Sequence, residues 1–131
     1  MRKYIITPVL LAIVCMVMCR CTSNRKASVA ANEYLIQGEL ANLPDSIVIG
    51  LYEEDGNILN CVLRDTLMNG QFSFRDTVST TRKMLIMSDN RGFPGTWLEV
   101  WIAPGEYIEI KGQDKLVKTW EVVSDVPEQQ E

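Results

Sequence analysis

The stretch Asn69-Gly70-Gln71-Phe72-Ser73-Phe74-Arg75 decides the fold class of this chain. Its first two residues form an Asn-Gly pair, which is a strong signal for a tight turn. After the turn, Phe72 and Phe74 alternate with polar residues, as they would in a strand that buries only one face. The stretch therefore predicts a turn that leads into a half-buried β-strand.

The same pattern of short apolar runs and turn residues continues on both sides of this stretch. Short runs at such spacing are typical of an all-β sandwich or barrel, and Asp55-Gly56 predicts a second tight hairpin. We expect an all-β fold, an antiparallel β-sandwich of seven to eight short strands, over residues 33–126. The predicted strands are Tyr34 to Ala41, Ile47 to Tyr52, Ile58 to Leu63, Gln71 to Arg75, Arg82 to Ser88, Trp97 to Ile102, Tyr107 to Lys111 and Trp120 to Val123.

Composition and charge exclude several classes of function. The chain has 131 residues and a net charge of −4, and it contains no histidine. An acidic domain without a basic stripe argues against binding nucleic acid or anionic lipid headgroups. Without histidine, Ser–His and Cys–His nucleophile pairs and imidazole zinc sites are impossible. We therefore expect no catalytic residues, no cofactor and no metal site.

The N-terminus predicts export. Arg2 and Lys3 precede an apolar run from Tyr4 to Cys19, which is broken only by Thr7 and Pro8. A positive start followed by an apolar run of this length is typical of a signal peptide, and the run is short for a helix that crosses a bilayer. Residues 1–20 are therefore predicted to be a helical signal peptide; an uncleaved membrane anchor is the alternative.

The cysteines favour a signal of the lipoprotein type. In such signals a cysteine just after the apolar run becomes the lipidated N-terminus, and a polar tether follows it. Cys21, followed by Thr-Ser-Asn, is the preferred lipidation site, and Cys19 is the second choice. Neither Arg20 nor Met18 is the small residue that normally precedes a lipidated cysteine, so the choice between the two sites stays open. Residues 21–32 are predicted to be the tether.

Four segments together resemble a known family: Gln37 to Leu40, Asn69 to Phe74, Ala103 to Ile110 and Trp120 to Asp125. In this order they are similar to the small N-terminal domain of unknown function that precedes thioredoxin-like domains of the TlpA/ResA type in Gram-negative envelope lipoproteins. The resemblance covers residues 33–126 and implies an accessory domain. The chain has no Cys-x-x-C motif, so thiol–disulfide activity is not carried over.

Three aromatic residues are candidate contact sites. Trp97 and Trp101 share one face of a predicted strand with Glu99, and two rings beside a carboxylate would suit a sugar or a protein partner. The alternative is a central strand that is buried on both faces, with Glu99 paired to a basic residue. Phe93 is predicted to be an exposed aromatic in a flexible loop, for which a plain connection without a binding role is the alternative. The acidic run 53–55 lacks calcium-loop spacing and predicts a solvated hairpin tip.

These observations predict a lipoprotein of the Gram-negative cell envelope, lipid-anchored to the inner or outer membrane and facing the periplasm or the exterior. It would act as a non-enzymatic interaction module, for which a thioredoxin-like domain or another envelope protein is a candidate partner. One alternative is the N-terminal portion of a thiol–disulfide oxidoreductase whose thioredoxin-like domain lies outside this chain. A second is a carbohydrate-binding module that uses Trp97 and Trp101. Residues 127–131 are predicted to be a polar tail.

Overall fold

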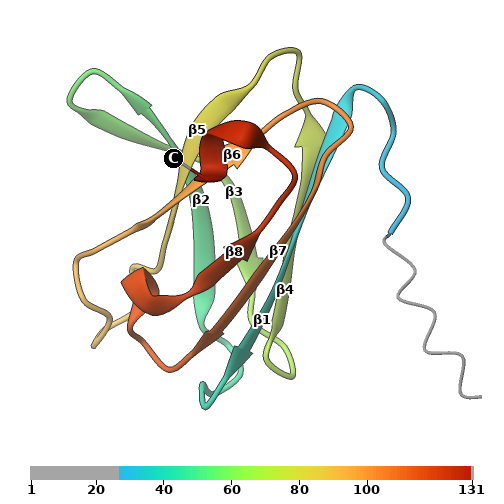
Figure 1. Ribbon diagram of the computed structural model, residues 1–131. Helices are drawn as coiled ribbons and strands as arrows, with labels where there is room; N and C mark the ends of the chain where they lie inside the picture. The colour runs from blue at the N-terminus through green and yellow to red at the C-terminus, as the bar shows by residue number, and fades with distance from the viewer. Residues whose placement is uncertain (1–26, 131) are drawn as a thin grey trace, which may run out of the picture.

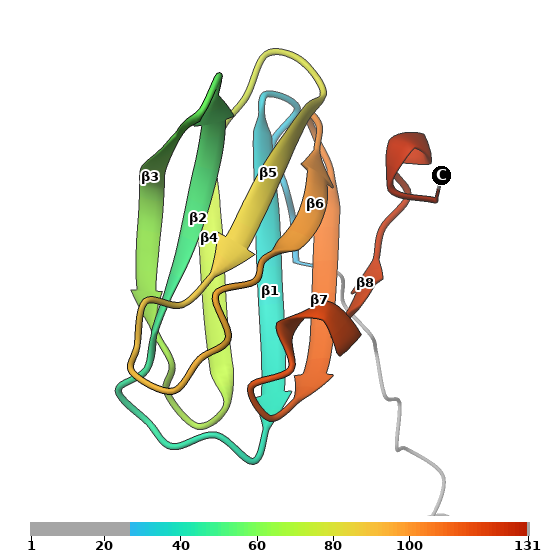
Figure 2. The ribbon, with the colours of Figure 1, turned by 90° about the vertical axis from the view of Figure 1, so that its left-hand side faces the viewer.

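The structure is a computed structural model that describes residues 27–130; the predicted signal peptide and both lipidation candidates, Cys19 and Cys21, lie outside the described residues. Eight strands form two sheets of four that pack face to face, as the sequence predicted (Figures 1 and 2). The strands are β1 (Glu33–Ala41), β2 (Val48–Asp55), β3 (Ile58–Thr66), β4 (Gln71–Thr77), β5 (Arg82–Met87), β6 (Leu98–Ile102), β7 (Tyr107–Gln113) and β8 (Glu121–Val123).

One strand pair departs from the expected antiparallel arrangement. Sheet A has the order β4-β1-β7-β8 and sheet B the order β3-β2-β5-β6. Five of the six strand pairs are antiparallel, but β1 and β7 run parallel, with Ile36 opposite Ile108. Parallel neighbours need a long crossover, and five other strands separate β1 from β7 along the chain. Hairpin signals report only local connections, so the sequence pattern missed this pair.

The Asn69-Gly70 turn carries the chain from one sheet to the other. Both residues have positive φ, 51° and 74°, as a type I′ turn requires. Met68 and Gln71 flank the turn and exchange two backbone hydrogen bonds, of 3.1 and 2.9 Å. The predicted turn is therefore confirmed, and it links β3 of sheet B to β4 of sheet A.

The core lies between the two sheets and follows the alternation of apolar residues in the strands. Ile36 and Ile108 of sheet A face Ile49 and Ile86 of sheet B, and all four are fully buried. Each buried aliphatic side chain contributes about 1.5–3 kcal/mol. The intervening residues of β1 and β7 point outward, so the periodicity that builds the core also builds an outer face on sheet A that is polar at Gln37, Glu39, Glu109 and Lys111, while Leu35 on β1 is buried.

The hairpin between β2 and β3 extends beyond the body of the sandwich (Figure 1). The register shifts between Leu51 and Tyr52, where β3 has one extra residue, and such a bulge bends a hairpin away from its sheet. The acidic run 53–55 lies in this hairpin, with Glu54 and Asp55 exposed at its tip. The predicted solvated tip is confirmed.

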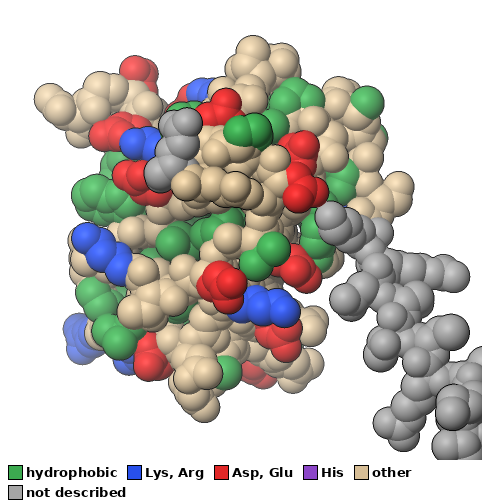
Figure 3. Space-filling view, in the orientation of Figure 1, with side chains coloured by type: hydrophobic (Ala, Val, Ile, Leu, Met, Phe, Trp, Pro, Cys, Tyr) green, Lys and Arg blue, Asp and Glu red, His purple; other side chains and the backbone are tan. Residues whose placement is uncertain are grey.

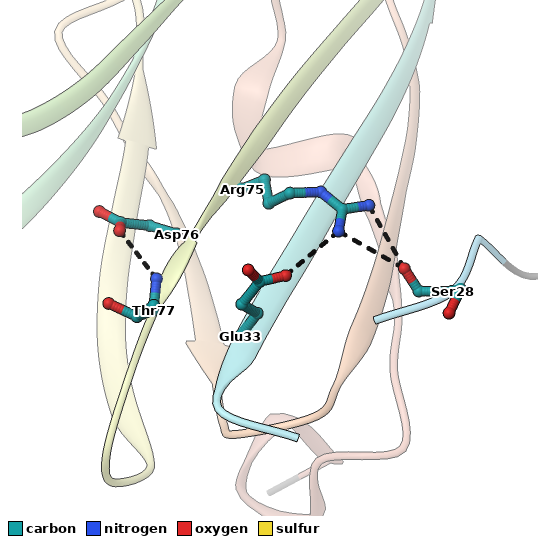
Figure 4. Close-up of polar contacts among 5 residues, drawn as sticks. All are labelled: Ser28, Glu33, Arg75, Asp76 and Thr77. Atoms are coloured by element: carbon teal, nitrogen blue, oxygen red, sulfur yellow. Dashed lines mark hydrogen bonds and ion pairs between the residues drawn. The ribbon is translucent and has the colours of Figure 1, made fainter. Parts of the chain in front are cut away.

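The last part of the predicted tether lies against the domain. The Nη1 and Nη2 groups of Arg75 donate to the carbonyl oxygen of Ser28 at 3.5 and 3.4 Å, and Arg75 also pairs with Glu33 at 3.2 Å (Figure 4). On the same strand, the Thr77 backbone N–H donates to Asp76 at 2.7 Å. Residues 27–32 are therefore part of the folded unit, which begins before residue 33.

The C-terminal segment crosses from sheet A to sheet B. It passes through a 3₁₀ turn, η3 (Val117–Thr119), then β8, and ends in a second turn, η4 (Pro127–Gln130). The side-chain amide of Gln129 caps the free edge of β6: it accepts a hydrogen bond from the Trp101 N–H at 2.7 Å and donates to the Glu99 carbonyl at 3.3 Å. The predicted polar tail is thus ordered through residue 130 and protects a sheet edge.

Replacing Gln129 tests this cap. Gln129→Ala removes both hydrogen bonds and leaves a backbone donor of β6 without its partner, so we expect the free energy of unfolding to fall by about 1–2 kcal/mol. Urea denaturation measures the change. Gln130→Ala, at an exposed position of the same turn, is the control and should have almost no effect. Equal losses in the two variants would show that the amide does not protect the edge.

Tyr34 predicts a loss of stability at alkaline pH. Burial raises its pKa from 10.0 to about 12, and the nearby Asp76 adds to the shift while Arg82 opposes it. Because the folded state holds the phenol proton more tightly than the unfolded state does, this contribution is complete below pH 10 and is lost between pH 10 and about 12. Tyr34→Phe should flatten the decline of stability over that range. An identical decline of the free energy of unfolding in both proteins would contradict a raised pKa for Tyr34.

Candidate binding surface

Trp97 and Trp101 lie on the outward face of β6, as the alternation predicted, but β6 is an edge strand. The alternative of a central strand buried on both faces is therefore wrong. Trp97 precedes β6 and is 43% exposed, whereas Trp101 is half-buried. Glu99, between the two tryptophans, forms an ion pair with Lys83 at 3.5 Å, so the expected pairing of Glu99 with a basic residue is confirmed. Four residues of extended backbone separate the Cα atoms of the two tryptophans by about 13 Å.

Phe93 is not the exposed loop aromatic that the sequence predicted. Its ring is half-buried and packs against the core, with the Lys115 ammonium 5.9 Å from the ring centroid. Its backbone N–H donates to the Asn90 carbonyl at 3.1 Å, and the Asn90 side chain accepts from the Val48 N–H at 2.9 Å. The loop is therefore tied to the sandwich, and Phe93 serves as a packing residue.

A tyrosine–aspartate pair stabilises the outer face of sheet B. The Tyr52 hydroxyl donates to Asp89 at 2.7 Å, and the ring lies over Gly50, where a Cβ would overlap it. Burial and the bond to Asp89 both raise the pKa of Tyr52, so its phenol stays protonated at neutral pH. This contact fixes the loop after β5 to β2.

Cys61 forms no disulfide within residues 27–130. It is a free, half-buried thiol on the edge strand β3, and its Sγ lies 3.5 Å from the Leu63 carbonyl oxygen. Its partial exposure follows from its position on β3, which ends the sheet.

The outer face of sheet A is hollowed by two adjoining depressions, which we call the sheet A groove. The first, of about 450 Å³, covers β4, β1 and β7 and reaches the end of β3 and the turn before β4 at Asp65, Thr66, Met68 and Asn69. The second, of about 590 Å³, covers β1, β7 and β8. Glu39 and Lys111 line both, so the groove crosses all four strands. Its outward side chains are Gln37, Glu39, Gln71, Ser73, Tyr107, Glu109, Lys111, Gln113 and Glu121.

Tyr107 is the aromatic residue of the groove, and its position is fixed. Its hydroxyl donates to Oε1 of Gln37 on the neighbouring strand at 2.8 Å, with Oε1 of Glu109 at 3.4 Å. Partial burial, followed by the charge of Glu109, raises the pKa of Tyr107, so the phenol is neutral at physiological pH. The groove thus contains an aromatic ring that is held in place between an amide and a carboxylate.

The groove carboxylates Glu39, Glu109 and Glu121 lie outside the ion pairs of the described residues. Residues 27–130 contain three ion pairs, and these neutralise Glu33, Glu53 and Glu99, the second of them through Arg82. None of the three uses Glu39, Glu109 or Glu121, although Lys111 lies opposite both Glu39 and Glu121 in the strand register. Figure 3 shows acidic side chains along the right-hand flank, where sheet A lies. The lining of the groove therefore has more acidic than basic side chains, with Lys111 as its basic residue.

Sequence reasoning did not single out the groove. Its residues come from strands that are far apart along the chain, and β1 and β7 meet only through the parallel pair. The available signal was the polar half of each alternating strand, such as Gln37 and Glu39 or Tyr107 and Glu109. This signal indicates an outward face but does not say which faces adjoin.

Within the described part of the chain, no group of three metal-ligating side chains is close enough to hold an ion. The same residues include no helix of the length and hydrophobicity needed to cross a bilayer. No protein-family model matches this chain, and neither a curated protein nor a solved structure does.

Proposed function

We propose that this protein is a non-enzymatic binding module of the bacterial cell envelope, held at a membrane by a lipid on its N-terminal cysteine. The sheet A groove is its contact surface. The observation that carries the proposal is that, among residues 27–130, this groove is open and lined largely by polar side chains, whereas the edge of β6 is capped and the outer face of sheet B is occupied by paired side chains.

The groove is suited to recognition because rigid strands hold its side chains. Central strands fix the positions of amides, carboxylates and a phenol better than loops do. Gln37 and Glu109 are already bonded to Tyr107, so little side-chain entropy remains to be lost when a ligand binds. The excess of carboxylates over basic side chains adds a local field that attracts positive or hydrogen-donating groups.

The resemblance to thioredoxin-associated domains supports an accessory role, with a thioredoxin-like domain as one candidate partner. It also favours a second candidate function, that of the N-terminal portion of a thiol–disulfide oxidoreductase. The gene sequence beyond the codon for Glu131 separates the two. An open frame that encodes Cys-x-x-C would establish the second candidate, and a stop codon would exclude it.

Metabolic labelling with a palmitate analogue tests the lipid anchor. We expect label in the full chain and in Cys19→Ser, and loss of label in Cys21→Ser, because Cys21 precedes the polar tether. Loss in Cys19→Ser alone would move the lipid to Cys19. An unlabelled parent protein would contradict the anchor.

Co-purification from the envelope in mild detergent tests the contact surface. Gln37→Arg with Ser73→Arg puts two large side chains into the groove, and we expect the co-purifying component to fall about tenfold, as buried contact sites allow. Asn57→Arg with Asn60→Arg adds the same charge at the exposed hairpin and is the matched control. Equal effects of the two pairs would place the contact elsewhere.

A further inference from the structure

We infer that the sheet A groove binds a neutral oligosaccharide, with Tyr107 as the ring against which one sugar stacks. This inference rests on the proposed function and names the ligand class of the same surface. It is carried by the shape, the side-chain chemistry and the charge of the groove.

The shape favours an elongated ligand. Two depressions of about 450 and 590 Å³ adjoin at Glu39 and Lys111 and cross four strands. Three inter-strand spacings correspond to about 14 Å. The groove is therefore longer than a single sugar requires, and it suits several linked sugar units lying across the strands.

The side chains that line the groove match the hydroxyl groups of sugars. Each sugar hydroxyl can donate one hydrogen bond and also accept hydrogen bonds, so a binding protein must place acceptors and donors close together. Donors and acceptors both come from the side-chain amides of Gln37, Gln71 and Gln113. Further acceptors come from the carboxylates of Glu39 and Glu109. The large apolar residues that line the first depression are Phe72 and Ile110, which are 3% and 0% exposed, and Met68 of the turn before β4, which is 57% exposed.

Tyr107 supplies the apolar contact that a sugar ring needs. A phenol combines an apolar ring face with a polar hydroxyl group, and the Tyr107 hydroxyl already donates a hydrogen bond to Gln37. The ring is half-buried, so part of its surface is open to a ligand. This arrangement differs from Trp97 and Trp101, whose indoles are separated along an edge strand.

Charge narrows the class of sugar. Glu39, Glu109 and Glu121 line the groove without ion pairs among residues 27–130, and Lys111 is the one basic side chain in its lining. Uronic acids, sulfated sugars and phosphorylated sugars would be repelled at short range. Neutral sugars meet no such penalty, and their hydroxyls donate to the carboxylates in charge-assisted hydrogen bonds.

Titration calorimetry on the full chain tests the inference, in a zwitterionic detergent that has no sugar headgroup. The probes are the neutral hexasaccharides chitohexaose, cellohexaose, maltohexaose and mannohexaose, the anionic oligogalacturonate of equal length, and an octalysine peptide. We expect at least one neutral hexasaccharide to bind with Kd below about 1 mM, and the anionic one not to bind.

Variants place the binding in the groove. We expect Tyr107→Ala to weaken binding about tenfold and Gln37→Ala about fivefold. Tyr107→Phe, which keeps the ring, should bind within about threefold of the parent and shows that the site remains folded. Trp97→Ala should leave binding unchanged.

Three results would overturn the inference: no neutral hexasaccharide binds, the oligogalacturonate binds as well as they do, or Trp97→Ala abolishes binding while Tyr107→Ala does not. Binding of octalysine alone, lost with Gln37→Arg, would replace the glycan with a basic peptide and leave the proposed binding function intact. By contrast, if the arginine pair in the groove and the arginine pair on the hairpin lowered co-purification equally, that result would refute the proposed function itself.

Discussion

Gly38→Ala should lower the free energy of unfolding by about 3 kcal/mol, a large loss for the addition of one methyl group. Gly38 lies on the inner face of β1, where a Cβ atom would overlap the ring of Phe72. The ring cannot move aside easily, because it is 3% exposed and packs at 58° and 5.6 Å against Phe74. Urea denaturation measures the loss.

Two controls accompany this variant. Gly95→Ala introduces the same methyl group where no atom lies within 4 Å, and we expect a change below about 0.5 kcal/mol. In a Phe72→Ala background the obstacle is gone, so Gly38→Ala should then cost little. Full additivity of the two substitutions would contradict the close contact between Gly38 and Phe72.

Ile108→Ala should cost about 3 kcal/mol, through the lost burial and the cavity that remains. Ile108 is 0% exposed near the start of β7, opposite Ile36 in the parallel pair and in the core between the two sheets. The matched control is Ile58→Ala at the hairpin tip, where the side chain is 63% exposed. We expect the control to lose less than about 0.5 kcal/mol. Similar losses at both positions would contradict the burial of β7 between β1 and β8.

Local signals in the sequence were sufficient for the strands and tight turns. The alternation at Phe72 and Phe74 and the Asn69-Gly70 turn involve residues that are close in sequence. The β2–β3 hairpin also forms, but its turn residues are Gly56-Asn57, one position after the predicted Asp55-Gly56 pair. Period-two burial and positive φ are properties of such short segments. The eight predicted strands accordingly match the eight observed, with ends that differ by a few residues.

The same local signals do not predict which strands that are distant in sequence pair with one another. That β1 lies beside β7, or that β6 lies at an edge, depends on how strands distant in sequence fit together in space. The Trp97 and Trp101 pattern indicated an outward face correctly, but not the strand's neighbours. Gln129 illustrates the same limit, since nothing near it in sequence indicates that its amide caps β6, some 28 residues away.

The groove was missed for a related reason. Gln37 and Tyr107 form its central contact, yet 70 residues separate them along the chain. Polar residues in alternating strands indicate only that they face solvent, because solvation and ligand binding use the same residue types. The groove depends on which polar faces adjoin, with Gln37, Glu39, Tyr107 and Glu109 brought together by the parallel pair of β1 and β7, and this becomes visible only in three dimensions.

Site-specific photocrosslinking in intact cells tests most directly the claim that sheet A carries the contact surface. A photoreactive residue replaces Gln37 in the groove or, as a control, Asn60 on the exposed hairpin. We predict a discrete adduct from position 37 and none of that size from position 60. An adduct from position 60 with none from position 37 would contradict the assignment of the groove as the surface through which this protein works.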